Sequence, residues 1–249
     1  MNDCAANWVQ PEPILEEYIP KKSSVKFPRI EIHLLVKKDQ STWYQKNLAT
    51  LIAALEKEPV SIRICDHVEG NIRDARIAAY KAAQTEYVGY VDPDDAIVPG
   101  VYQKLLDAIQ TEHVGAFCKQ YRGSIHSIGL FPFSYPDKWS LAWHAKGETH
   151  TVMPAFIARR EAYLKACEHV DVIPDIWGQD RAIAMLASAY GDWELVDHFG
   201  YVWRSTGENV SKLMQEKHSI QAFYDRIWPA YGRALELRAI ELRKENERC

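Results

Sequence analysis

The sequence reads Tyr87-Val88-Gly89-Tyr90-Val91-Asp92-Pro93-Asp94-Asp95 at the point that decides its fold. The first five of these residues are apolar, aromatic or β-branched apart from one glycine, which is typical of a buried strand. The strand stops at three carboxylates, and ligand sites in α/β proteins open where strands end. Carboxylates this close repel one another unless a cation lies between them, and hard divalent cations take oxygen ligands that they share with substrate phosphates. The alternative is a polar turn, because Asp and Pro favour turns and Asp caps helices.

A helix-forming segment, residues 71–83, directly precedes this strand. Its small and apolar residues recur at helical spacing, so that one face can pack on a sheet. Arg73 and Arg76 lie three residues apart and therefore share a face near the helix start. Guanidinium groups beside carboxylates suit a diphosphate with its metal, because their N–H forks match phosphate oxygens. Without the neighbouring strand, the same arginines would read as solvated residues of a surface helix.

Two further strands and a helix lie upstream. Residues 29–36 and 60–66 read as strands, the second of which ends in Asp66, and residues 41–58 read as the helix between them. The order is therefore strand, helix, strand, helix, strand, acidic cluster, helix. This alternation predicts an α/β protein with a mostly parallel central sheet, flanked by helices and Rossmann-like in its first half.

Taken in order, four pieces resemble the nucleotide-binding half of glycosyltransferase family 2, whose members have the GT-A fold. They are the strand at 29–36, Asp66, the Arg-Asp-Ala-Arg helix start at 73–76, and Val-Asp-Pro-Asp-Asp at 91–95, which looks like the family's DxD motif with an extra aspartate. The resemblance implies a metal-dependent inverting transferase. Such an enzyme moves a sugar from a nucleotide-diphosphate donor, with UDP as the expected nucleotide, to a hydroxyl acceptor.

The same resemblance implies roles for individual residues. Asp94 is implied as a ligand of Mn²⁺ or Mg²⁺, with Asp92 helping through the cation or the ribose. Asp66 is implied near the base or ribose of the nucleotide. Arg73 and Arg76 are implied near the nucleotide and its phosphates.

The second half of the chain matches the family more loosely. Residues 158–164 resemble the strand-to-helix segment behind the acceptor site, and residues 177–181 resemble the segment that usually reads Glu-Asp and carries the catalytic base. Gln179 stands where Glu is common, so the role of general base falls on Asp180. The alternative is that Asp180 caps the following helix, and one residue could fill both roles. Three other carboxylates are further candidates for the base: Glu148, Asp171 and Asp175.

Some related GT-A enzymes use a late histidine as an extra metal ligand. His198, His150 and His218 are the contenders here, and their spacing does not choose among them. A lone histidine more often serves as a structural hydrogen-bonding group. The polar segment 205–211 reads either as a loop that closes over the donor or as an ordinary surface connection.

Aromatic residues gather in the segment 131–144, which has weak periodicity. They either line a pocket for a sugar-faced acceptor or form a satellite core beneath a long loop. The residues concerned are Phe131, Phe133, Tyr135, Trp139, Trp143 and His144.

Composition narrows the class of protein. The chain has 249 residues, of which 47% are hydrophobic, enough for a sizeable core. The net charge of −4 gives no electrostatic case for bulk binding of nucleic acid or membrane. Five widely spaced cysteines without a CxxC pair favour a reduced, cytoplasmic protein. No apolar run reaches membrane-spanning length, and residues 1–28 are too acidic and proline-broken for a signal peptide.

The expected organisation has three parts. An extended tail (1–28) precedes a GT-A catalytic domain (29–215), and C-terminal helices (216–249) follow it. The catalytic domain divides into a nucleotide-sugar half (29–112) and an acceptor half (113–215).

The C-terminal part contains Pro229, which is expected to break or kink its helix because proline lacks the N–H that the helix needs. This part would pack on the body of the protein or pair with a second copy in a homodimer.

Two other classes of function stay open. One is a nucleotide-sugar-binding protein without turnover, for which Gln179 is the only hint. The other is a metal-dependent nucleotidyltransferase or phosphotransferase, which would need a glycine-rich phosphate loop after the first strand, whereas residues 36–40 contain no glycine. The acceptor is open among a glycan, a small molecule, a protein and a modified base in viral DNA.

Overall fold

The computed structural model describes most of the chain in seven stretches: residues 29–37, 41–67, 71–124, 127–142, 155–175, 178–205 and 220–247. The predicted tail at 1–28 and residues 206–211 of the predicted donor loop lie outside them. The same holds for five predicted side chains: Trp143, His144, Glu148, His150 and His218.

The first half folds as the predicted alternation of strands and helices. β1 (Ile30–Val36), β2 (Val60–Asp66) and β3 (Tyr87–Tyr90) are joined by α1 (Thr42–Leu55) and α2 (Ile72–Ala82). β1 pairs in parallel with both β2 and β3. The helices begin where short polar side chains cap them: the Ser41 hydroxyl accepts the Tyr44 backbone N–H, and the Asn71 side chain accepts the Asp74 N–H. The predicted Rossmann-like arrangement is therefore confirmed for this half.

The remaining elements extend the same sheet. In chain order they are β4 (Ala96–Ile97), α3 (Val101–Ala108), β5 (His113–Ser124), β6 (Ser127–Pro132), β7 (Phe156–Arg159), α5 (Arg160–Cys167), α6 (Gln179–Ala187), the 3₁₀ turn η1 (Ser188–Tyr190), β8 (Asp192–Ser205) and α8 (Ile220–Asn246). The strand order is β2-β1-β3-β7-β5-β8-β4, and β6 pairs with the later residues of β5, beyond those that pair with β7. β5 and β8 are parallel, whereas β7 is antiparallel to both of its neighbours. The sheet is thus parallel in its first half and mixed in its second.

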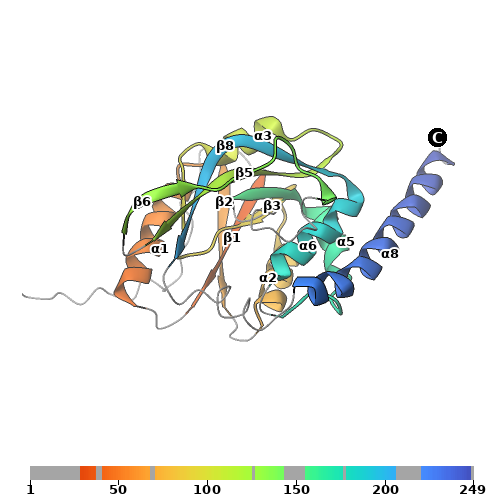
Figure 1. Ribbon diagram of the computed structural model, residues 1–249, viewed down its shortest axis with the longest axis horizontal. Coiled ribbons are helices and arrows are strands. Elements are labelled where there is room, and N and C mark those ends of the chain that lie inside the picture. The colour runs from red at the N-terminus through yellow and green to blue at the C-terminus, as the bar shows by residue number, and fades with distance from the viewer. Residues whose placement is uncertain are drawn as a thin grey trace, which may run out of the picture.

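The sheet separates two hydrophobic cores. One packs α1 and α3 on one face of the sheet through buried side chains such as Leu51, Leu55 and Leu105. The other packs α2, α5, α6 and the start of α8 on the opposite face, through residues such as Tyr163 and Ile183. In Figure 1 the helices α2, α5, α6 and α8 gather on the side away from α1. Both halves of the chain contribute to both cores, because β4 of the first half pairs with β8 of the second.

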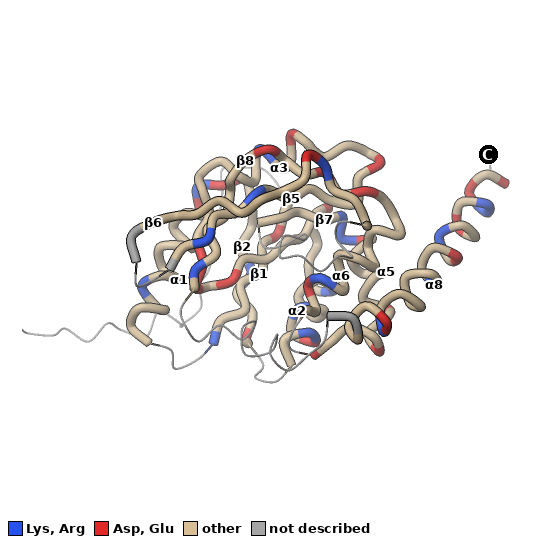
Figure 2. The backbone as a smooth tube through the Cα atoms, viewed as in Figure 1, with Lys and Arg blue, Asp and Glu red and all other residues tan. Residues whose placement is uncertain are grey.

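The C-terminal helix corrects the predicted break at Pro229. α8 runs without a break from Ile220 to Asn246 with Pro229 inside it. Proline in a helix interior costs about 3 kcal/mol, and burial of the neighbouring Ile227 and Ala230 in the core offsets that cost. The helix then extends past the body of the protein (Figure 1), where basic and acidic residues follow one another (Figure 2).

This projecting part of α8 also exposes apolar side chains: Leu235, Leu237, Ile240 and Leu242. The homodimer stays a prediction. In the part of the chain that the structure describes, no helix is both long and apolar enough to cross a membrane.

Candidate active site

The carboxyl ends of β1, β2 and β3 meet at one edge of the sheet, because these three strands are parallel. Lys37 follows β1, and Asp66 ends β2 opposite Val36, with His67 following it. The backbone N–H of His67 donates to the Val36 carbonyl at 3.0 Å, which ties the two strand ends together. Asp92 follows β3. This edge, called the acidic edge below, therefore collects side chains that are far apart in the sequence.

Arg76 lies buried beneath the acidic edge. Its side chain comes from the second turn of α2, is only 6% exposed, and lies with its guanidinium 3.4 Å from the centre of the Tyr90 ring. Nη2 donates to Oδ1 of Asp92 at 3.1 Å, whereas Nε and Nη1 have no hydrogen-bond partner within the described residues. Burial opposes the charge, but Tyr90 and Asp92 outweigh it, and the pKa of Arg76 lies above its ordinary value. The edge thus contains a permanent cation with unused donors.

Asp92 and Asp94 bring more negative charge than Arg76 can balance. The Asp92 side chain remains 38% exposed, so one carboxylate oxygen contacts Arg76 while the group stays open to solvent. Burial and the nearby Asp180 raise the pKa of Asp92, while Arg76 and His67 oppose them. Burial and the charge of Asp92 raise the pKa of Asp94 to about 6. Both carboxylates are therefore placed where a further cation would stabilise their ionised forms.

Asp180 reaches the same edge from the second half of the chain. It lies in the first turn of α6, whose N-cap is Gly178 with φ of 79°, so Asp180 is not the cap of this helix. A side chain at position 178 would be strained at this φ and would meet the Phe223 ring at 2.9 Å. Tyr90 donates its hydroxyl to Oδ2 of Asp180 at 2.9 Å. Tyr90 thus links the base candidate to the strand that carries Asp92.

Asp95, the third carboxylate of the motif, has a structural role. It is only 2% exposed and accepts hydrogen bonds from the Tyr201 hydroxyl and from the backbone N–H of Arg204, the latter at 2.6 Å. Asn47 of α1 donates to the carbonyl oxygens of Pro93 and Asp95 at 2.7 and 3.0 Å, and its own carbonyl oxygen accepts from the Arg204 guanidinium. These contacts, called the Asp95 clamp below, fix the loop that carries Asp92 and Asp94 between α1 and β8.

Asp66 lies on the acidic edge, whereas Arg73 contacts other residues. Asp66 is exposed at the end of β2, on the acidic edge. The Arg73 guanidinium donates instead to Asp74 at 2.8 Å and to Asp175 at 2.5 Å, and also to the Ile173 carbonyl at 3.1 Å. Arg73 therefore holds the start of α2 to the segment before α6. Arg76 contacts Asp92, whereas Arg73 is engaged by Asp74, Asp175 and Ile173.

His198, the histidine candidate within the described residues, does not join the two carboxylates. His198 is half-buried in an irregular part of β8 near Lys104, and burial followed by that charge lowers its pKa. Among the described residues, no three His, Cys, Asp or Glu side chains form a group that could hold a metal ion.

Gln179, the residue at which the chain departs from the family pattern, is buried. Its side chain is 6% exposed, and its Oε1 has no hydrogen-bond partner in the described part of the chain. In the aromatic segment, Phe131 is 67% exposed and Trp139 is buried. Trp139 lines a cavity at the other edge of the sheet.

Several residues of the site are not predicted from the sequence. The place of Tyr90 could have been predicted, because residues two apart on a strand share a face and Asp92 follows at that spacing. The place of His67 could also have been predicted, since it follows Asp66 at a strand end. The places of Asn47, Tyr201 and Arg204 could not, because their meeting with the motif depends on the tertiary fold.

The family model described as Glycosyl transferase family 2 matches residues 22–183, more than half of the chain. No curated protein sequence matches the chain significantly.

Among solved structures, the chain resembles S. aureus TarS. TarS 1–349 in complex with UDP-GlcNAc superposes with a TM-score of 0.55 at 14% identity, covering 80% of this chain and 64% of that one. A second structure of TarS 1–349 gives 0.51 at 14% identity, covering 71% and 60%. The chain thus spans less than two thirds of the TarS 1–349 chains. At this identity the likeness shows the fold, which is that of a GT-A glycosyltransferase.

Proposed function

Because the chain belongs to glycosyltransferase family 2, we propose that it transfers a sugar from a nucleotide-diphosphate donor to a hydroxyl acceptor with inversion and with the help of a divalent cation. UDP is the nucleotide that we test first, since one of the similar TarS structures is a complex with UDP-GlcNAc. The observation that carries the proposal is the meeting of Asp92, Arg76 and Asp180 at the acidic edge.

The donor set fits Mn²⁺ or Mg²⁺. Asp92 and Asp94 offer carboxylate oxygens, which are the ligands that hard cations prefer, and such cations complete their shell with substrate phosphates and water. Burial first, and neighbouring negative charge second, raise the pKa values of both carboxyl groups, and a bound cation would oppose both effects. A bound divalent cation would supply charge stabilisation for the departing diphosphate.

The chain's own residues supply the rest of the chemistry. Asp66 stands at the strand end beside β1, where a nucleoside can reach it. Nε and Nη1 of Arg76 are buried and have no hydrogen-bond partner among the described residues. The guanidinium is therefore a buried cation that attracts phosphate oxygens. Asp180 takes the proton of the acceptor hydroxyl as general base. The Tyr90 hydroxyl occupies Oδ2 of Asp180 and so leaves Oδ1 for the acceptor.

The proposal is tested by measuring thermal stability with UDP and with a panel of UDP-sugars, each with and without Mn²⁺. A ligand that binds only the folded state raises the melting temperature by mass action. We expect a Mn²⁺-dependent increase with UDP that the Asp94→Asn variant loses. Asp107→Asn, which changes an exposed carboxylate on α3, is the matched control and should respond as the wild type does.

A Mn²⁺-dependent increase of equal size in Asp94→Asn would overturn the assignment of the metal ligands. Binding without any hydrolysis or transfer of the sugar would instead favour the nucleotide-sugar-binding protein that Gln179 leaves open. Product analysis by NMR then reads the anomeric configuration, and retention would contradict a direct displacement with Asp180 as base.

A further inference from the structure

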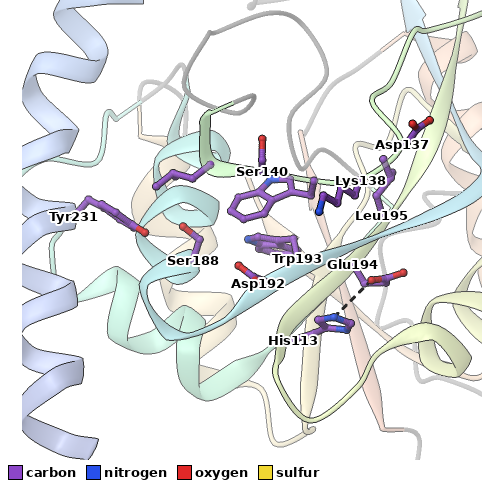
Figure 3. Close-up of a pocket in the computed structure, with 12 residues that line it drawn as sticks. His113, Asp137, Lys138, Ser140, Ser188, Asp192, Trp193, Glu194, Leu195 and Tyr231 are labelled. Atoms are coloured by element: carbon purple, nitrogen blue, oxygen red, sulfur yellow. Dashed lines mark ion pairs between the residues drawn. The ribbon is translucent and has the colours of Figure 1, made fainter.

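A cavity lies at the edge of the sheet opposite the acidic edge (Figure 3). It has a volume of about 460 Å³ and lies between the beginnings of β5 and β8, the turn η1, the helix α8 and the segment 137–141. Pockets that bind small molecules fall in the range of roughly 300–1,000 Å³. The cavity is therefore large enough for a ligand of one or a few rings.

The topology separates this cavity from the acidic edge. β3 and β5 are both antiparallel to β7, so they run in the same direction, and β8 is parallel to β5. The acidic edge follows the end of β3, whereas the cavity lies at the start of β5 and β8. β8 is 14 residues long, which at about 3.3 Å per residue spans roughly 45 Å. The cavity is at its first residues and the Asp95 clamp at its last.

Rigid aromatic side chains form the floor of the cavity. Trp139, Trp193 and Tyr231 line it, and each is less than 10% exposed. The Trp193 indole N–H donates to the Ala184 carbonyl at 3.2 Å, and its ring packs edge-on against Phe156 at 5.9 Å. These rings are held in place, so the small apolar area that each leaves uncovered is available at no cost in side-chain ordering.

The polar groups around the floor include one ammonium, that of Lys138, and three carboxylates that accept hydrogen bonds. Asp137, Asp192 and Glu194 contribute carboxylates, and Glu194 also pairs with His113 at 3.5 Å. The Ser188 hydroxyl donates its proton to the Met185 carbonyl at 2.6 Å, so its oxygen is left to accept. Figure 3 shows Ser188 and Asp192 beside the Trp193 ring.

A ligand for this cavity must therefore donate hydrogen bonds and carry an apolar face. Carboxylates repel phosphates and other carboxylates, and three of them line the cavity against one lysine, so the lining disfavours nucleotides and acidic sugars. A neutral sugar fits both demands, because its ring has a C–H face for an aromatic floor and hydroxyl donors at its rim. We propose that the cavity is a glycan subsite that binds one neutral sugar unit, and that this unit belongs to an extended acceptor glycan. The assignment of this sugar unit to an acceptor rests on the proposed function, whereas the binding of a neutral sugar does not.

The test uses protein labelled with 5-fluorotryptophan and ¹⁹F NMR, with the Trp139 signal assigned through Trp139→Phe. The probes are the methyl glycosides of glucose, galactose and N-acetylglucosamine, with glucuronate as an anionic counterpart, spermidine as an amine donor, and UDP with Mn²⁺ for the acidic edge. We expect a saturable shift of the Trp139 signal with at least one neutral glycoside and none with glucuronate.

Two variants of the same strand sharpen the result. Asp192→Asn should weaken glycoside binding about tenfold, while Asp197→Asn should leave it unchanged, because the Asp197 side chain is 90% exposed and paired with Lys119. Both variants should bind UDP as the wild type does. The proposal is overturned if no neutral glycoside shifts the signal, if glucuronate or spermidine alone does, or if Asp192→Asn binds glycosides normally.

The failure of this subsite and that of the proposed function give different results. Glycoside binding without any UDP binding would leave the cavity assignment intact and refute a UDP donor. UDP binding without glycoside binding would leave the UDP donor intact and refute the cavity assignment. If the bound unit belongs to the acceptor, long oligosaccharides should be better acceptors than short ones in the wild type, and Asp192→Asn should remove that preference by raising KM with little change in kcat.

Discussion

Removing one hydroxyl group from the Asp95 clamp should loosen the loop that carries Asp92 and Asp94. Tyr201→Phe deletes the donor that Tyr201 gives to the buried Asp95 carboxylate and leaves the Arg204 N–H at 2.6 Å as the remaining partner. Burial, followed by the charges of Asp94 and Asp92, raises the pKa of Asp95 well above its ordinary value, so this carboxyl is not a fixed charge. Leaving a buried acceptor without its partner costs about 1–3 kcal/mol. We therefore expect the free energy of unfolding to fall by that amount.

Urea unfolding measures this difference directly, and Tyr121→Phe is the matched control. Tyr121 lies half-buried on β5, stacked on Phe199 with ring centres 4.6 Å apart. Loss of its hydroxyl should change the free energy of unfolding by about 0.5 kcal/mol or less. Isothermal titration with UDP and Mn²⁺ provides the functional readout. Affinity in Tyr201→Phe should fall about tenfold, which corresponds to ~1.4 kcal/mol.

Two results would refute this reasoning. If Tyr201→Phe and Tyr121→Phe unfold with the same free energy as the wild type, the clamp contributes nothing to the fold. If Tyr201→Phe is destabilised but binds UDP and Mn²⁺ normally, the clamp supports the fold without positioning the donor loop.

Three further predictions concern other side chains. Asp180→Asn should reduce sugar transfer by roughly a hundredfold or more, the usual effect of losing a general base, while UDP affinity stays near wild type; near-normal turnover would remove Asp180 from the mechanism. Tyr90→Phe should lower kcat about tenfold with little change in the KM for the donor, and equal kcat values would show that the bond to Asp180 is incidental. Burial alone would raise the pKa of Glu31, but hydrogen bonds from His33 and Arg63 outweigh it and lower the pKa to about 2 from 4.5. Wild type should therefore exceed Glu31→Gln in stability by about 3 kcal/mol at neutral pH. That advantage should shrink as the pH falls from 4.5 toward 2, and an advantage independent of pH in urea unfolding would contradict it.

The sequence predicts the local parts of this fold well. β1, α1, β2, α2 and β3 follow from hydrophobic periodicity and short-range capping, since these signals depend on neighbours in the chain. Pairing partners are another matter. No local pattern near residues 156–159 predicts that β7 runs antiparallel between β3 and β5, because that pairing is fixed by packing between distant segments. The unbroken α8 shows the same limit, since burial around Pro229 overrides the local preference of proline.

The candidate site divides in the same way. Asp92, Asp94 and Arg76 are predictable, because a strand end and a helix start place them near one edge. The role of Asp95 is not, since its partners Tyr201 and Arg204 come from the far end of the chain. Arg73 resembles Arg76 in sequence, yet the segment before α6 engages its guanidinium, and only tertiary contacts distinguish the two.

The central claim is that the acidic edge binds a nucleotide diphosphate with a divalent cation. Anomalous diffraction from crystals grown with UDP and Mn²⁺ tests it most directly, because manganese scatters anomalously at a wavelength where the protein hardly does. The account predicts a manganese peak at the carboxylates of Asp92 and Asp94, with the diphosphate toward Arg76 and the nucleoside toward Asp66. A manganese peak elsewhere in the protein, or UDP bound away from the ends of β1, β2 and β3, would contradict it.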